Sequence, residues 1–158
     1  GVLFNKSISH LIACPCTKWD YVIPSSVTSI GELAFFHCKI LDSVVIPSSV
    51  SSIEHNAFCG CTALKSVTIP FGVTSISYGL FSECTSLETV VIPASVTEIE
   101  NYAFEDCSSL SSIAIPTSVT SIGEESFNHC KNLKHVFLPE HLAGQESKFP
   151  RSAYVRIR

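Results

Sequence analysis

Apolar residues recur along this chain every 23 residues, and most of the positions between them are polar. The dipeptide Ile-Pro marks each repeat, and five complete repeats follow one another over residues 23–137 without insertion or deletion. A fixed period with apolar columns predicts a solenoid, in which each repeat forms one coil and each column forms a ladder of like side chains. The main columns are Ile23, Ile46, Ile69, Ile92 and Ile115; Phe35, Phe58, Phe81, Phe104 and Phe127; Cys38, Cys61, Cys84, Cys107 and Cys130; and Leu41, Leu64, Leu87, Leu110 and Leu133.

Within one coil, the pattern Leu-x-x-Val-x-Ile-Pro predicts a short strand with alternating faces. In residues 41–47 we expect Val44 and Ile46 to point inward, and Ser43 and Val45 to point outward. Pro47 then ends the pairing, because proline has no N–H to donate. Stacked coils therefore predict a parallel sheet along the solenoid.

The opposite side of each coil is represented by residues 31–38, which are too few for a full helix. This segment predicts a turn, or a single turn of 3₁₀ or α-helix, with Ala34, Phe35 and Cys38 packed inward.

Composition narrows the possible functions. Apolar residues make up 46% of the chain and charged residues 15%, which excludes intrinsic disorder. The net charge of −4 argues against nonspecific binding to nucleic acid or to anionic membranes. No apolar run approaches the roughly 18 residues of a membrane span. The first residues lack the features of a signal peptide, and the absence of Met leads us to expect that the chain is part of a longer protein.

The repeat unit resembles the BspA-like, or Treponema-type, subclass of leucine-rich repeats over residues 23–139. The resemblance implies a leucine-rich-repeat solenoid of 23-residue coils, with a curved parallel β-sheet on the concave side and short turns or 3₁₀ segments on the convex side. The signature is carried by residues 46–61, in Ile46-Pro47-Ser48-Ser49-Val50-Ser51-Ser52-Ile53, Ala57-Phe58 and Cys61.

The sequence departs from this pattern at both ends and in one column. Residues 1–22 are out of phase and look like a lead-in hairpin or N-terminal cap, and residues 138–158 predict a partial repeat or C-terminal cap. Residues 23–137 remain as the five repeats. The Asn column of ordinary leucine-rich repeats is occupied here by Ser26, Ser49, Gly72, Ser95, Ser118 and His141.

The cysteines are the first candidates for chemistry. We interpret the Cys column as a ladder of buried thiols that pack as small apolar groups, because stacked identical residues point in parallel; disulfides along the column are the alternative. The pairs Cys14/Cys16 and Cys59/Cys61 lack the usual spacing of a zinc site, so no metal or cofactor is expected. Cys59 is expected on the surface, as the most reactive thiol.

Two His-Cys pairs, His37-Cys38 and His129-Cys130, could suggest a catalytic dyad, but adjacent residues on a turn point in different directions. A periodic solenoid also offers a smooth face rather than an irregular pocket. The sequence therefore predicts a protein that is not an enzyme.

Charge is unevenly distributed, since residues 23–137 hold 11 Asp/Glu and 4 Lys/Arg. We interpret this as a solvated acidic side, and a weak calcium site or a surface for a basic partner stay open as alternatives. The sequon Asn5-Lys6-Ser7 matters only in a eukaryotic secretory setting.

The candidate binding face consists of the outward residues of the predicted strands. Their small side chains would allow an extended protein segment to approach the backbone, although plain β-propensity also explains them. Only His135 and Phe137 provide anchors, so weak contacts multiplied over an array are the expected mode. The two outward columns are Asp20, Ser43, Ser66, Thr89, Ser112 and His135, and Val22, Val45, Thr68, Val91, Ala114 and Phe137.

The resemblance implies surface or secreted proteins of host-associated bacteria and parasitic protists, with roles in adhesion. The resulting hypothesis is a noncatalytic protein-protein interaction module of a cell-surface adhesin-like protein that binds host or neighbouring-cell proteins. Nucleic acid and direct membrane insertion are not expected. Two alternatives stay open: a structural spacer that displays other domains, and an intracellular leucine-rich-repeat scaffold or effector.

Overall fold

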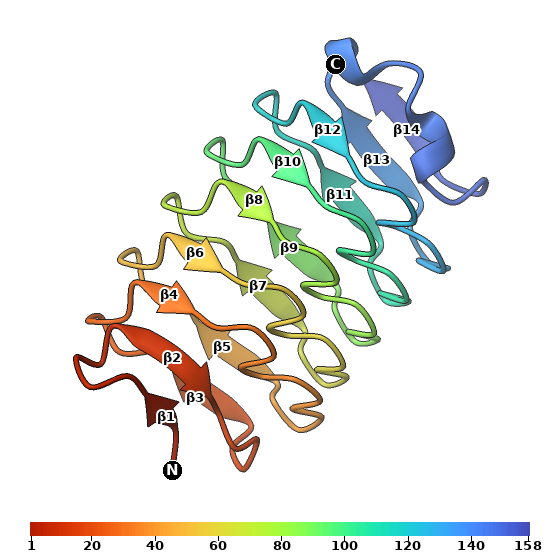
Figure 1. Ribbon diagram of the computed structural model, residues 1–158. Coiled ribbons are helices and arrows are strands. Elements are labelled where there is room, and N and C mark those ends of the chain that lie inside the picture. The colour runs from red at the N-terminus through yellow and green to blue at the C-terminus, as the bar shows by residue number, and fades with distance from the viewer.

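The computed structural model describes residues 1–158 as a solenoid of stacked coils (Figure 1). The solenoid predicted from the repeat is therefore the observed fold. The strand predicted in each coil forms the long-strand sheet, which is made of β3 (Asp20–Val22), β5 (Ser43–Val45), β7 (Ser66–Thr68), β9 (Thr89–Val91), β11 (Ser112–Ala114), β13 (His135–Leu138) and β14 (Tyr154–Ile157).

A second parallel sheet, which the sequence did not predict, runs along the stack beside the first (Figure 1). Its strands centre on a column of buried isoleucines, such as Ile30 and Ile53. Both sheets divide into two hydrogen-bonded parts, between β6 and β8 and between β9 and β11. This short-strand sheet consists of β2 (His10–Ala13), β4 (Ser29–Ile30), β6 (Ser52–Ile53), β8 (Ser75–Ile76), β10 (Glu98–Ile99) and β12 (Ser121–Ile122).

The register between coils places each residue beside its equivalent in the next repeat. Ser66 lies opposite Thr89, and Ser112 lies opposite His135, each 23 residues further along the chain. The identical step in every repeat is what turns the sequence columns into ladders. The step is 19 residues at the two ends of the stack, where His10 lies opposite Ser29 and His135 lies opposite Tyr154.

Most of the short strands lead into a six-residue double turn. Together these double turns form what we call the turn edge, which consists of residues 32–37, 55–60, 78–83, 101–106 and 124–129. The turn edge is made of turns and contains no 3₁₀ helix, so of the two forms expected for this segment the turn is the observed one. Two residues of each turn have positive φ, such as Leu33 at 59° and His37 at 52°, and this interrupts any helical run. The 3₁₀ helices lie instead near the C-terminus, as η1 (Glu140–Leu142) and η2 (Glu146–Lys148).

The turn edge is also a ladder of main-chain hydrogen bonds. Every second N–H in a turn donates to a carbonyl of the following coil, and the N–H groups between them close the turn within their own coil. The carbonyls therefore face the preceding coil and the donors face the next one. In the second turn, the N–H groups of Asn56, Phe58 and Gly60 donate to Tyr78 O, Leu80 O and Ser82 O at 2.9, 3.1 and 2.8 Å.

The serine column that replaces the usual asparagines supplies a further ladder. Each hydroxyl donates to a carbonyl of the preceding coil: Ser49 to Val27 O at 2.7 Å, and Ser118 to Val96 O at 2.6 Å. At the end of the column, His141 Nε2 donates to Val119 O at 2.7 Å. The column therefore keeps its bonding role after the residue type changes.

The core is one continuous cluster of 40 buried residues. The five column phenylalanines stack nearly parallel, with ring centroids 4.8–5.7 Å apart and interplanar angles of 11–16°. Tyr21 contacts the first ring of this stack and Phe149 contacts the last. Because the stack is continuous, each ring is covered on both faces by neighbouring coils or by the ends.

The ends of the solenoid are closed in different ways. At the N-terminus, β1 (Leu3–Phe4) pairs antiparallel with β2, and β2 pairs parallel with β4. At the C-terminus, η1 and η2 precede β14, which pairs with β13. No helix in the structure has the length and apolar character needed to cross a bilayer.

The substitution Ser126→Ala should stabilise the protein. Ser126 occupies a column that holds alanine in three other coils, and its buried hydroxyl has no hydrogen-bond partner. Removing an unsatisfied buried hydroxyl should raise the free energy of unfolding by about 1 kcal/mol, which corresponds to a Tm increase of about 2–4 °C. Thermal unfolding followed by circular dichroism measures this change.

Ser118→Ala is the matched control, because the Ser118 hydroxyl donates to Val96 O. This substitution should lower the free energy of unfolding by about 1 kcal/mol. Equal effects of the two substitutions would contradict the assignment of Ser126 as unsatisfied.

Candidate protein-binding face

The outward residues of the long-strand sheet form two rows, as the alternation of the strand pattern predicts. Between the rows, the middle residue of each strand points into the core, for example Val67 at 3% exposure. All predicted members of the rows are exposed except Phe137, which is half-buried. The first row holds Asp20, Ser43, Ser66, Thr89, Ser112 and His135, and the second holds Val22, Val45, Thr68, Val91, Ala114 and Phe137.

Strand β14 extends both rows with residues that the sequence did not identify. Tyr154 lies opposite His135, and Arg156 lies opposite Phe137. The guanidinium carbon of Arg158 lies 5.5 Å from the centroid of the Phe137 ring, which places a cation over its face. We call these five residues the anchor cluster. The alternation in residues 154–157 was a possible signal, but the shortened coil put it out of phase with the columns.

A shallow hollow of about 490 Å³ lies beside the second row. Because Ala114 belongs to the row and Arg158 to the anchor cluster, the hollow adjoins the candidate face. Half of its lining is apolar, and it consists of Ile92, Ala94, Ala114, Pro116, Thr117 and Arg158.

The other end of the face carries a single large aromatic residue. Trp19 is 72% exposed, and with Asp20, Asp42 and Ser43 it lines a hollow of about 200 Å³. Lys65 Nζ lies 2.9 Å from Asp42 Oδ2 at this end. An apolar anchor beside carboxylates here contrasts with the aromatic and basic cluster at the far end.

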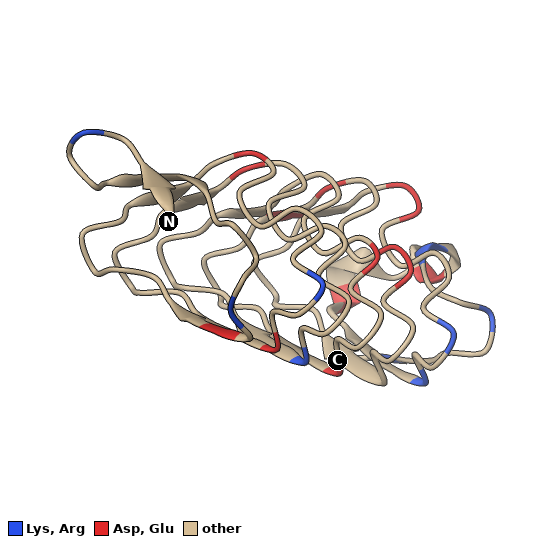
Figure 2. Ribbon diagram, turned by 90° about the horizontal axis from the view of Figure 1, so that it is seen from below, with Lys and Arg blue, Asp and Glu red and all other residues tan.

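Charge also separates along the stack. Residues 98–125 contain six Asp/Glu and no Lys/Arg, whereas residues 131–158 contain six Lys/Arg and two Asp/Glu. Figure 2 shows several blue segments at the end of the stack opposite the N-terminus, and other blue segments elsewhere along the stack. The anchor cluster therefore lies at the basic end.

No group of three His, Cys, Asp or Glu side chains is placed to hold a metal ion.

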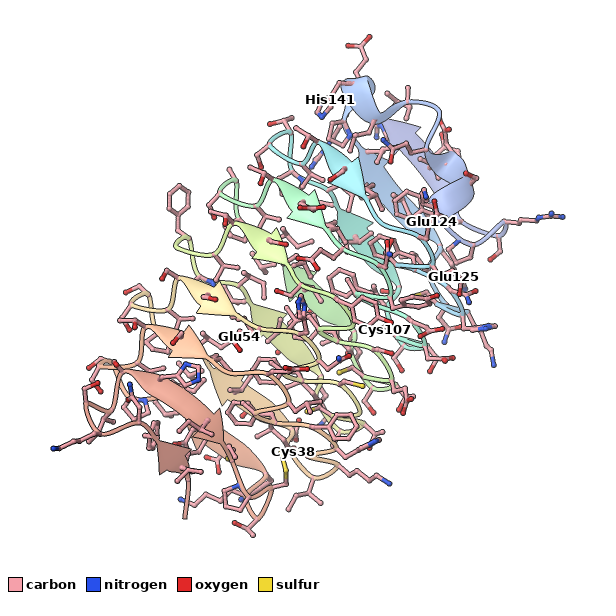
Figure 3. The ribbon with its side chains drawn as sticks, viewed as in Figure 1. Cys38, Glu54, Cys107, Glu124, Glu125 and His141 are labelled. Atoms are coloured by element: carbon pink, nitrogen blue, oxygen red, sulfur yellow. A yellow bond between two sulfur atoms is a disulfide. The ribbon has the colours of Figure 1, made fainter.

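The cysteine column differs from the prediction at its first position. Cys38 forms a disulfide with Cys16, and their Cα atoms are 4.6 Å apart (Figure 3). The argument that column residues point in parallel does not apply to this pair, because Cys16 belongs to the lead-in segment. The disulfide also excludes Cys38 as a partner of His37 in a nucleophilic dyad.

The remaining column thiols are buried, as predicted, and they also make hydrogen bonds. Each Sγ–H donates to the carbonyl of the phenylalanine in the preceding coil, at 3.1–3.2 Å. Burial raises the pKa of Cys130 to about 12, and it raises the pKa of Cys84 and of Cys107 well above the ordinary value. A protonated Cys130 cannot act as a nucleophile with His129.

Cys59 is not the exposed thiol that the sequence predicted, because only 8% of it is accessible. Burial, followed by the nearby Glu83 carboxylate, raises its pKa to about 11. Cys14 is half-buried, and burial raises its pKa as well. Burial therefore disfavours the thiolate form of Cys14, Cys59, Cys84, Cys107 and Cys130.

A family model of known proteins matches the 23-residue repeats of this chain. The model of the BspA type leucine-rich repeat region matches residues 8–134 in six copies. The chain belongs to the BspA-type leucine-rich repeat family. No curated protein matches the sequence of this BspA-type protein.

Three solved structures illustrate the relationship. The T. pallidum leucine-rich repeat protein shares 29% identity and a TM-score of 0.80, over 94% of this chain and 72% of that one. A leucine-rich repeat protein from Bacteroides ovatus shares 27% identity and a TM-score of 0.71, over 90% and 43%. A leucine-rich cell surface protein from Faecalibacterium prausnitzii shares 36% identity and a TM-score of 0.61, over 74% and 38%. This BspA-type chain thus spans less than half of the latter two.

Thiol alkylation should be slow in the folded protein and should depend steeply on pH. Because only the thiolate reacts, a Cys59 pKa of about 11 means that its alkylation rate should rise about tenfold per pH unit between pH 7 and 10. Iodoacetamide labelling followed by peptide mass spectrometry measures each site. Cys107 should stay unlabelled over this range, and its rapid labelling at pH 7 would contradict the buried ladder.

Proposed function

We propose that this chain is a noncatalytic protein-interaction module of a cell-surface adhesin-like protein, and that it binds host or neighbouring-cell proteins through the long-strand face. The observation that carries the proposal is the anchor cluster at the end of a face otherwise built from small side chains. The BspA-type repeat fold is consistent with an interaction module, and the partner and its location belong to the proposal.

The rows provide the surface along which a partner would lie. Their small side chains let an extended segment or the flat side of a protein approach the sheet closely. Exposed valines add apolar area, with Val22, Val45 and Val91 each more than half exposed. Such a surface can match the shape of a partner along the length of the sheet, but it offers no single deep pocket.

The anchor cluster provides the residue types that dominate binding energies, since Tyr and Arg are enriched at hot spots. Tyr154 is 67% exposed, and Arg158 covers the Phe137 ring. A partner with aromatic or acidic groups would fit this end, because the surrounding residues are basic. The small side chains alone could not give a tight contact.

Two observations favour the cell surface over an intracellular scaffold. The Cys16–Cys38 disulfide suits an oxidising compartment. The Faecalibacterium prausnitzii protein, which is 36% identical, is described as a cell surface protein. A surface array of such modules would multiply weak individual contacts.

Substitutions in the anchor cluster should weaken binding to host matrix proteins. Phe137→Ala or Tyr154→Ala should each reduce affinity by about 30-fold, which corresponds to a hot-spot loss of about 2 kcal/mol. Surface plasmon resonance with immobilised matrix proteins that bind the wild-type chain measures the effect.

Thr89→Arg should also reduce binding, because it places a long charged side chain in the middle of the first row. Ser48→Arg is the matched control, since Ser48 is exposed in a turn outside the sheet. Wild-type affinity in both Phe137→Ala and Thr89→Arg would show that the partner does not use this face.

A further inference from the structure

The last coil of the solenoid is four residues shorter than the five complete repeats. Equivalent residues of the long-strand sheet are 23 positions apart up to His135, but His135 pairs with Tyr154, which is 19 positions later. His141 still occupies the serine column and Leu142 is buried in the valine column. The shortfall therefore lies between Leu142 and Tyr154, where the chain would otherwise form another double turn.

This shortening leaves the turn edge of residues 124–129 without the partner that every earlier turn has. In the preceding turn, the N–H groups of Tyr102, Phe104 and Asp106 donate to the next coil at 3.1, 2.8 and 2.9 Å. The equivalent N–H groups of Glu125, Phe127 and His129 donate to no protein acceptor. Three aligned main-chain donors thus face the space beyond the last turn; Phe127 is buried, whereas Glu125 and His129 are exposed.

That space is a pocket of about 540 Å³, within the range of roughly 300–1,000 Å³ typical of ligand sites. Glu125, Phe127 and His129 line one side, and residues 147–150 with Ser152 line the other. Figure 3 shows Glu124 and Glu125 at this end of the stack, next to the C-terminal part of the chain. The unpaired donors therefore belong to residues that border the pocket.

Charges around the pocket balance. Its lining contains Glu124, Glu125, Lys131 and Lys148, and Lys148 Nζ donates to the Glu124 carboxylate. An anion would meet two carboxylates, and a cation would meet the three donors. Uncharged acceptors such as main-chain carbonyls fit both the donors and the balanced charge.

We propose that this pocket binds a peptide segment of a partner protein, which completes the turn edge by presenting main-chain carbonyls at alternate residues to the three free donors. The earlier double turns are the model for this binding, because in each of them three alternate N–H groups donate to three alternate carbonyls of the next coil. A second copy of the chain is a poor occupant: its corresponding carbonyl, Ala34 O, already accepts from the Cys14 N–H at 2.7 Å. The site is separate from the long-strand face and does not depend on the function proposed for that face.

The test uses the isotope-labelled chain and a synthetic peptide with the sequence of residues 75–83. This segment supplies Tyr78 O, Leu80 O and Ser82 O to the donors of its preceding coil. Titration at millimolar concentration should shift the amide resonances of Glu125 and His129 saturably, with little change at the paired amides of the preceding turn.

Two controls define the site. A peptide with Gly79→Pro should bind about tenfold more weakly or not at all, because Gly79 has a φ of 57° that proline cannot adopt. In the protein, Ser152→Trp should fill the pocket and weaken binding by about tenfold or more, whereas Ser48→Trp, outside the pocket, should leave it unchanged.

Four results would overturn the proposal. They are the absence of saturable shifts at Glu125 and His129, equal binding by Ser152→Trp, equal shifts with sodium phosphate alone, and self-association that Ser152→Trp abolishes. The third would make the pocket an anion site, and the fourth would make it an interface between copies. Loss of matrix-protein binding in the Phe137→Ala variant leaves all of these readouts unaffected, so the two proposals fail independently.

Discussion

The whole structure depends on main-chain hydrogen bonding between equivalent residues of successive coils. A single coil has no enclosed core, so its apolar side chains are buried only when another coil covers them. The turn edge shows how strongly this pairing constrains the backbone. Residues such as Leu33 and Tyr102 adopt positive φ, at a cost of roughly 1–2 kcal/mol each for an L-residue. The cost is offset because the resulting geometry directs three donors per turn to the next coil.

The same requirement explains the polar and sulfur-containing columns. Carbonyls at the corners of each coil need donors, and the serine hydroxyls and cysteine thiols provide them from the following coil. The hydrogen bonds give the cysteine column a bonding role, and burial raises the pKa of Cys84, Cys107 and Cys130 above the ordinary value. The need for donors also accounts for His141, which continues the serine column with an imidazole donor.

The period predicted the coil length, the inward columns and the outward positions of the long-strand face. Features that break the period were not predictable. Cys16 lies outside the columns, so its bond to Cys38 was missed, and Tyr154 and Arg156 were missed because the preceding coil is four residues short. Cys59 was misplaced because a position beside a column was assumed to be exposed. The short-strand sheet was missed because two-residue strands such as Ser29–Ile30 show no alternation of their own.

Because successive coils are held by the same contacts, the solenoid should respond in a particular way when it is pulled along its axis. Each coil is held only by its neighbours, so tension would peel coils away one at a time rather than rupture the solenoid at once. Each detached coil would release 23 residues, which extend to about 80 Å. The Cys16–Cys38 bond fastens the lead-in segment to the first coil, so this unspooling cannot separate those two parts. A tether built in this way would lengthen under load and dissipate mechanical work, coil by coil, before the attachment broke.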